Sequence, residues 1–233
     1  MTSPLSAICI IPARGGSKRI PRKNIRPFRG KPILSWSIEA ALASVEFDTV
    51  MVSTEDREIA AVARMLGADV PFLRSAETSD DHATTSDVLL EVLRCYAEEG
   101  REFDLVCCLY PTAPFVQPQS LSEGRARLLD SDFDVMMPVA AFSYPIWRSL
   151  KRGDEGCIQM NFPENLDVRS QDLPQAYHDA AQWYWFFADK FLRDRVLLGA
   201  FTGSIVLPAT QVQDIDNEED WMLAEIKHER IFG

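Results

Sequence analysis

A basic, glycine-containing loop follows the first apolar segment of the chain. Residues 10–24 read IIPARGGSKRIPRKN, and residues 1–38 hold eight lysines and arginines but no aspartate or glutamate. Glycine amides at the end of a buried strand can approach phosphate oxygens, while arginine and lysine side chains neutralise their charge. The spacing is not that of a Walker loop. In a chain of net charge −11, this cluster predicts one local polyanion site. The alternative is a nucleic-acid or localisation patch, but the two glycines and Pro21 favour a shaped loop.

Two aspartates near the end of the chain are candidate metal ligands. Asp214 and Asp216 are two residues apart in the segment VQDIDNEEDW. Mg²⁺ bound by few carboxylates is suited to offset the negative charge of phosphate groups. The competing interpretation is a helix cap, with Asp216 as N-cap and Glu219 at the third helical position. From the residues alone, the cap is the more frequent explanation of this pattern.

The hydrophobic pattern predicts an α/β fold that positions these segments. Buried strands are expected at 7–12, 49–53, 105–110 and 135–139, with shorter or later ones at 70–73, 182–187 and 204–207. Helices are expected at 32–40, 55–66, 86–98, 119–129 and 218–231. This alternation predicts a Rossmann-like, doubly wound, mostly parallel sheet, with ligands at the carboxyl ends of its strands.

Composition argues against several other classes. A strongly acidic chain is not typical of a general nucleic-acid binder. No apolar run reaches the roughly 18–20 residues that span a bilayer, and no secretory signal pattern opens the sequence, so a cytoplasmic location is expected. The five cysteines form no CxxC pair, and three of them lie in apolar runs, which favours buried free thiols. The three histidines match no zinc spacing.

Taken together, the motifs resemble nucleotidyltransferases that activate acidic nine-carbon sugars with CTP. These are the CMP-sialic acid synthetases, or acylneuraminate cytidylyltransferases, and, closer still, the pseudaminic acid cytidylyltransferases. Besides the basic loop, the resemblance is carried in collinear order by FDTVMVSTED (47–56), VPFLRSAETSDD (70–81), LYPTAPF (109–115), RSQDLPQAYHDAAQWYW (169–185) and VQDIDNEEDW (212–221). It implies a fold of the nucleotide-diphospho-sugar transferase type, a Mg²⁺ cofactor and a homodimer.

The resemblance also implies a role for individual residues. The catalytic residues would be Arg14, Lys23 and Asp216, and the metal ligands would be Asp214 and Asp216, which puts metal binding ahead of the helix cap. The nucleotide-binding set would be Arg14, Gly15, Gly16, Lys23, Asn24, Arg74, Asp81, Thr84, Thr85, Tyr110, Pro111 and Thr112. The sugar-binding set would be Arg169, Gln171, Tyr177, His178 and Tyr184.

Departures from the sialate pattern bear on the sugar. Tyr110 stands where sialate enzymes usually carry a glutamine that faces the pyrimidine, and His178 stands where they tend to have arginine. Ala180-Ala181 replaces their Asn-Gly. These differences favour pseudaminic acid over sialic acid, and legionaminic acid remains an alternative. The expected reaction is attack of the anomeric hydroxyl on the α-phosphate of CTP, which gives a CMP-sugar and pyrophosphate.

Two alternatives belong to different functional classes. Asp214-Ile-Asp216 is formally a DxD metal motif, which would suit a glycosyltransferase, although that motif is expected nearer mid-chain. The other alternative is an inactive nucleotide-binding protein, which would not need a complete metal constellation.

The length of 233 residues fits one domain with a single excursion. From about 140 to 180 the strand–helix alternation stops, and proline, arginine, aromatic and amide residues accumulate. Four aromatic residues there are expected either at a dimer surface or over the sugar site, namely Phe142, Tyr144, Trp147 and Phe162.

Overall fold

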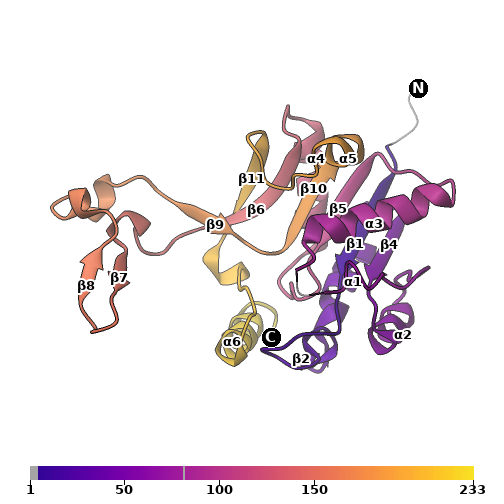
Figure 1. Ribbon diagram of the computed structural model, residues 1–233, viewed down its shortest axis with the longest axis horizontal. Helices are drawn as coiled ribbons and strands as arrows, with labels where there is room; N and C mark the ends of the chain where they lie inside the picture. Colours follow the sequence, from indigo (N-terminus) through magenta and orange to yellow (C-terminus); the bar gives the residue numbers. More distant parts are fainter. Residues whose placement is uncertain (1–4, 81) are drawn as a thin grey trace.

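The structure is a computed structural model that describes residues 5–80 and 82–233 (Figure 1). Asp81, one of the expected nucleotide contacts, lies outside the described residues. The main sheet has the strand order β11-β6-β10-β5-β1-β4. These strands are β1 (Ala7–Pro12), β4 (Thr49–Ser53), β5 (Leu105–Leu109), β6 (Val135–Ala141), β10 (Trp183–Phe187) and β11 (Thr202–Leu207).

Five of the seven described strands of this sheet run in the same direction, as predicted for a mostly parallel sheet. Strand β1 pairs in parallel with both β4 and β5, and β11 pairs in parallel with β6. Two strands run the other way: β10 lies between β5 and β6 and is antiparallel to both, and β9 (Tyr177–Asp179) pairs antiparallel with β6. The carboxyl ends of β4, β1 and β5 therefore lie side by side at one edge of the sheet.

Helices cover both faces of the sheet. They are α1 (Ile33–Ser44), α2 (Arg57–Met65), α3 (Thr85–Glu98), α4 (Pro118–Leu129), α5 (Ala188–Asp194) and α6 (Glu218–Phe232). Residues of β1 alternate between two core clusters because successive side chains point to opposite faces of a strand. Cys9 and Ile11 pack with residues of α1, α2 and α4, whereas Ile8 and Ile10 pack with residues of α3 and α5. All four are fully buried, which explains the uninterrupted apolar sequence of β1.

The N-terminus of α6 differs from the expected cap. Asn217, not Asp216, is the N-cap: its side chain accepts a hydrogen bond from the amide of Asp220, at 3.0 Å. In return, Asp220 Oδ2 accepts from the amides of Asp216 and Asn217. The prediction that Asp216 and Glu219 form the capping box was wrong by one residue. The carboxylate of Asp216 is therefore not engaged in capping.

Two other segments differ from the prediction. Residues 70–73 form no strand; only Asp69 makes an isolated bridge, to Met51, before the chain turns away. A two-residue hairpin, β2 (Pro27–Phe28) with β3 (Lys31–Pro32), extends the basic loop and was not anticipated. Cys9, Cys107 and Cys108 are buried free thiols, as expected. No helix in the described part of the chain has the length and apolar character needed to cross a bilayer.

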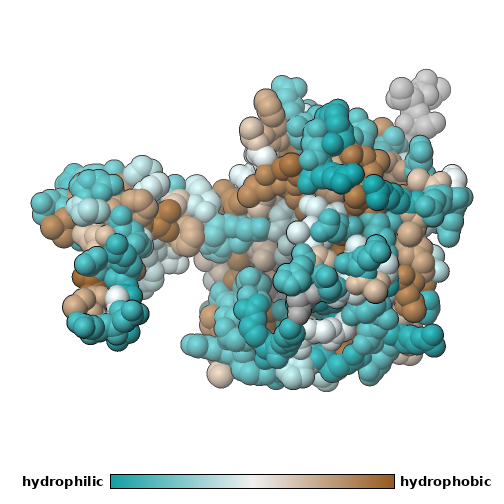
Figure 2. All heavy atoms as spheres, viewed as in Figure 1, coloured by the Kyte–Doolittle hydropathy of each residue, from teal (hydrophilic) through white to brown (hydrophobic). Residues whose placement is uncertain are grey.

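Residues 142–176, called the arm here, leave the sheet after β6 and extend away from it (Figure 1). The arm contains a hairpin of β7 (Leu150–Arg152) and β8 (Ile158–Met160), with short 3₁₀ turns at 146–148, 163–165 and 170–172. The chain returns as β9 (Tyr177–Asp179), antiparallel to β6. Figure 2 shows apolar side chains at the surface of the arm; Tyr144 is 84% exposed.

Candidate active site

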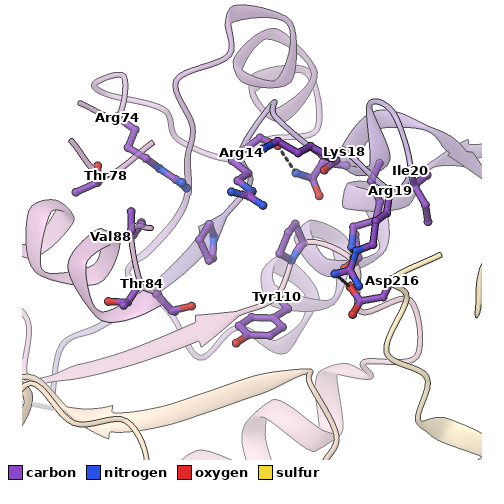
Figure 3. Close-up of a pocket in the computed structure, with 18 of the residues that line it drawn as sticks. Arg14, Lys18, Arg19, Ile20, Arg74, Thr78, Thr84, Val88, Tyr110 and Asp216 are labelled. Carbon is purple, nitrogen blue, oxygen red and sulfur yellow. Dashed lines mark hydrogen bonds and ion pairs between the residues drawn. The ribbon is translucent and has the colours of Figure 1, made fainter. Parts of the chain in front are cut away.

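A cavity of about 430 Å³ lies at the carboxyl ends of β4, β1 and β5 (Figure 3). The loop after β1 and the residues that follow β5 form two of its walls, and the start of α3 and the segment before α6 close it. Parallel α/β sheets bind ligands at this position because strand ends and helix N-termini converge there. The fold therefore brings together residues that are about two hundred positions apart in sequence.

Most of the predicted nucleotide and metal residues line this cavity. They are Arg14, Lys23, Asn24, Arg74, Thr84, Thr85, Tyr110, Pro111, Thr112, Asp214 and Asp216. The lining also includes residues to which the sequence analysis assigned no role, among them Ser17, Lys18, Arg19, Thr78 and Asp80. Lys18 and Arg19 belong to the basic loop, so the charge pattern of that loop could have predicted them. No sequence pattern marks Thr78 and Asp80 as site residues.

Gly15 and Gly16 do not line the cavity. The amide of Gly15 donates to Glu55 Oε1 at 2.7 Å, and a Cβ atom at Gly15 would lie 2.6 Å from Asp56 Oδ2. A Cβ atom at Gly16 would meet no atom within 4 Å. The close packing of the loop against the start of α2 therefore requires glycine at position 15. A direct role of either glycine toward phosphate stays a prediction.

The basic loop is held in place by bonds to its own backbone and to the segment before α6. Asn24 is buried and donates through Nδ2 to the carbonyl of Arg14 at 2.8 Å. Lys23 Nζ donates to the carbonyl of Ile215 at 2.6 Å. Burial lowers the pKa of Lys23, and the nearby charges of Asp216 and Asp214 oppose that effect. Lys23 thus connects the basic loop to the segment that carries the two candidate metal ligands.

Arg74 is oriented by the end of β4. It is 8% exposed, and its guanidinium donates to the carbonyl of Ser53 at 2.6 Å and to Ser53 Oγ at 3.1 Å. Burial lowers the pKa of Arg74, and the charge of Glu55 opposes this. A buried arginine held by fixed acceptors has lost its conformational freedom before any ligand arrives, so it can contact an anion at little further entropic cost.

Asp214 and Asp216 lie together at one end of the cavity. Burial raises the pKa of Asp214, and repulsion from Asp216 raises it further. Asp216 Oδ1 lies 2.8 Å from Arg19 Nη2 and 3.8 Å from Lys23 Nζ. Within residues 5–80 and 82–233, no cluster of three or more His, Cys, Asp or Glu side chains could hold a metal by itself. Mg²⁺ in phosphate sites is usually bound by one or two carboxylates plus substrate phosphates, so this pair fits such an ion.

Charge is distributed unevenly around the cavity. Figure 3 shows Arg74, Arg14 and Lys18 along one side and Thr84 and Tyr110 on the opposite side. The first side can offset the charge of a polyphosphate, and the second offers hydroxyl groups and an aromatic ring. The cavity therefore combines a cationic side, which suits phosphate groups, with a facing side of hydroxyl groups and an aromatic ring.

The five predicted sugar-binding residues do not line this cavity. Tyr184 is buried behind Tyr110, with 5.5 Å between ring centroids. Tyr177 and His178 lie on β9, and His178 lines a separate cavity of about 370 Å³ together with Phe142, Gln213 and Lys227. The other two of the five predicted residues lie in the arm.

Those two arm residues are Arg169 and Gln171. Arg169 forms an ion pair with Asp172 at 2.6 Å, and its side chain is 71% exposed. Neither residue contacts the main cavity, so their role toward a sugar stays a prediction.

Comparison with known proteins agrees with this geometry. The cytidylyltransferase family model matches residues 8–190. The chain is 38% identical over 229 residues to the pseudaminic acid cytidylyltransferase of Campylobacter jejuni, which covers 97% of this chain and 99% of that protein. It is 34% identical over 219 residues to N-acylneuraminate cytidylyltransferase A of Danio rerio, covering 93% of this chain and 49% of that protein.

A solved structure of a CMP:2-keto-3-deoxy-manno-octonic acid synthetase complexed with CTP has the same fold. It matches with a TM-score of 0.69 at 17% sequence identity and covers 97% of this chain and 98% of that chain. The family match spans most of the sheet and both sides of the cavity. The chain belongs to the cytidylyltransferase family.

Proposed function

We propose that the protein couples CTP to a nine-carbon 2-keto sugar acid, with pseudaminic acid as the preferred sugar, and releases pyrophosphate. The observation that carries this proposal is the single cavity in which a row of cationic side chains approaches a pair of carboxylates at the carboxyl ends of parallel strands. Family membership and the similarity to a pseudaminic acid cytidylyltransferase over nearly the whole chain support the nucleotide and the class of sugar.

In this proposal, the cationic side of the cavity holds the triphosphate. Arg14, Lys23 and the pre-oriented Arg74 offset the negative charge that moves onto pyrophosphate as it leaves the α-phosphorus. The anomeric hydroxyl of the sugar attacks the α-phosphorus, and the reaction needs no covalent enzyme intermediate. Lys23 is bonded to the carbonyl of Ile215 and lies close to Asp216, so its position is fixed relative to the candidate metal ligands.

Asp214 and Asp216 would hold Mg²⁺ together with phosphate oxygens. When bound, this ion neutralises phosphate charge and lowers the pKa of a coordinated hydroxyl. A cation held by these residues would also offset the repulsion from Asp216, which adds to burial in raising the pKa of Asp214.

We further propose that the chain acts as one nucleotidyltransferase domain in the cytoplasm and forms a homodimer through the arm. The arm presents exposed apolar side chains, including Tyr144, Leu150 and Ile158, to solvent. A second copy packed against the arm would bury these apolar side chains, which favours association. Arg169 and Gln171 would then reach a sugar only if the arm of one copy approaches the cavity of the other.

Pyrophosphate release with CTP and Mg²⁺ tests the reaction. The sugar acids to compare are pseudaminic acid, N-acetylneuraminic acid, legionaminic acid and 3-deoxy-manno-octulosonic acid. Turnover with pseudaminic acid alone is expected. Turnover with a different acid would keep the chemistry and correct the sugar, and N-acetylneuraminic acid is the second candidate because of the 34% identity to an N-acylneuraminate cytidylyltransferase. If folded protein that binds CTP releases no pyrophosphate with any of the four acids, the proposal is contradicted.

The metal assignment has its own test. We expect Asp216→Asn to abolish turnover without changing the melting temperature, because Asp216 does not cap α6. Asp194→Asn is a matched control, since Asp194 is an exposed carboxylate at the end of α5 and pairs with Arg193. Full activity of the Asp216 variant in Mg²⁺ would exclude Asp216 as a metal ligand. Isotopic oxygen placed in the anomeric hydroxyl should remain in the CMP-sugar.

A further inference from the structure

Residues 75–80, which follow Arg74 and lead toward the start of α3, form part of the wall of the main cavity. Thr78 and Asp80 of this segment line the cavity, as Arg74 does (Figure 3). The structure describes neither helix nor strand in residues 75–80. The position of this part of the wall therefore depends on side-chain contacts and not on a regular backbone ladder.

Glu91 of α3 supplies such contacts through its carboxylate. Its Oε1 accepts a hydrogen bond from the amide of Ser75 at 2.7 Å. Its Oε2 accepts from Ser75 Oγ at 3.2 Å and from the hydroxyl of Thr78. Hydrogen bonds to an ionised acceptor are about twice as strong as those between neutral groups. One carboxylate therefore ties the segment to α3 at two positions.

The segment has a second anchor at the residue that precedes it. The amide of Arg74 donates to the carbonyl of Thr54 at 3.0 Å, and the guanidinium of Arg74 is bonded to Ser53. The chain is thus fixed to the end of β4 at Arg74, and to α3 at Ser75 and Thr78. Together the two anchors set the path by which the segment enters the cavity wall.

We propose that Glu91 is a positioning residue for nucleotide binding, which holds residues 75–80 against α3 so that this wall is in place before the ligand arrives. Glu91 is partly buried and is not among the described residues that line the cavity, so it acts through Ser75 and Thr78. A loop without these bonds has more conformational freedom, and a ligand that must order it binds less tightly. The inference rests on the proposed function only for the identity of the nucleotide as CTP.

A purely electrostatic role of the same carboxylate would have the opposite effect on binding. Burial lowers the pKa of Arg74, and the charges of Glu55 and Glu91 oppose this, so the charge of Glu91 reaches the cationic side of the cavity. If Glu91 acted only through its charge, its removal would strengthen the binding of a polyphosphate, because like charges repel. If Glu91 acts by positioning, its removal weakens that binding.

Two substitutions separate these roles. Glu91→Leu removes both the acceptors and the charge but keeps a residue with a similar helix preference. Glu91→Gln removes the charge, yet its oxygen still accepts from the amide of Ser75. Its amide group can also donate to the hydroxyls of Ser75 and Thr78, which accept as well as donate. Glu98→Gln is the matched control, because Glu98 is exposed at the end of the same helix.

Hydrogen–deuterium exchange of the full chain without ligand tests the anchoring. Peptides that cover residues 75–80 should exchange faster in Glu91→Leu than in the wild type, while peptides from β1 and β5 keep their rates. Isothermal titration calorimetry with CTP and Mg²⁺, without sugar, tests the consequence. The Kd for CTP should rise about five- to tenfold in Glu91→Leu and less than about twofold in Glu91→Gln. Glu98→Gln should keep the wild-type exchange and the wild-type Kd.

Unchanged exchange of residues 75–80 in Glu91→Leu would overturn the inference. Faster exchange with unchanged CTP affinity would overturn it too, since a merely structural contact gives that result. Tighter CTP binding by both Glu91 variants would replace positioning with a charge effect. If the wild type binds no CTP, that result counts against the proposed function, whereas the exchange experiment without ligand still decides whether Glu91 holds the segment.

Discussion

His228 of α6 occupies an aromatic cage next to the basic loop. It is 3% exposed, and ring centroids of Phe28, Trp36, Phe115 and Phe232 lie between 4.3 and 5.9 Å from its own. Its Nε2 is buried and has no hydrogen-bond partner among the described residues. Burial, followed by the charges of Arg29 and Lys31, lowers the pKa of His228 to about 4.

The direction of the resulting pH effect follows from this lowered pKa. The unfolded chain binds a proton at His228 near the ordinary value of 6.5, whereas the folded chain resists it until about pH 4. Stability from the neutral imidazole is therefore complete above pH 6.5 and is lost as the pH falls toward 4. At about 1.36 kcal/mol per pH unit, the full loss is about 3 kcal/mol. Below pH 4 this group contributes no further change.

Replacing His228 with methionine isolates this contribution. Methionine has a similar volume, adapts to irregular cavities and cannot be protonated. Urea unfolding at pH 7.5 and pH 4.5 should show that the wild type loses about 2–3 kcal/mol more free energy of unfolding than His228→Met over this interval. His82→Gln, a change at an exposed histidine, should keep the wild-type dependence. Parallel pH dependence in the wild type and His228→Met would refute the reasoning.

Two further predictions concern the loop and the last helix. Gly15→Ala should destabilise the fold by about 1–3 kcal/mol and reduce CTP binding, because the new methyl group would clash with Asp56, whereas Gly16→Ala should be tolerated. Thermal unfolding and calorimetry on this matched pair check the expectation, and equal effects would contradict it. Asn217→Ala should cost about 1 kcal/mol through loss of the α6 cap, measured by urea unfolding, while Asp220→Ala should cost a comparable amount if the capping box acts as a unit.

Local patterns predicted most of the fold. Strands such as β1 and β4 are continuous apolar runs, and helices such as α3 carry a capping pattern and regular apolar spacing, so each is encoded by its own residues. The antiparallel insertion of β10 between β5 and β6 could not be predicted, because strand pairing depends on residues far apart in sequence. The cap of α6 was misplaced because two neighbouring residues, Asp216 and Asn217, are both favoured N-cap types.

The site was predictable where charge is concentrated in sequence. Arg14, Lys23, Asp214 and Asp216 stand out as a basic cluster and an acidic pair, and the cavity brings them together. Thr78 and Asp80 gave no such signal, since their place in the lining depends on how the segment between α2 and α3 folds over the strand ends.

The position of β10 also constrains how the protein is synthesised. In the main sheet, β10 is the strand that joins the β4-β1-β5 half to the β6-β11 half. A nascent chain halted on the ribosome before residue 183 would hold β5 and β6 with open, apolar edges. The arm would already have been translated by then, although the sheet could not yet close. Completion of the hydrophobic core would thus await a segment from the last quarter of the chain, and a chaperone that shields strand edges would act before that point.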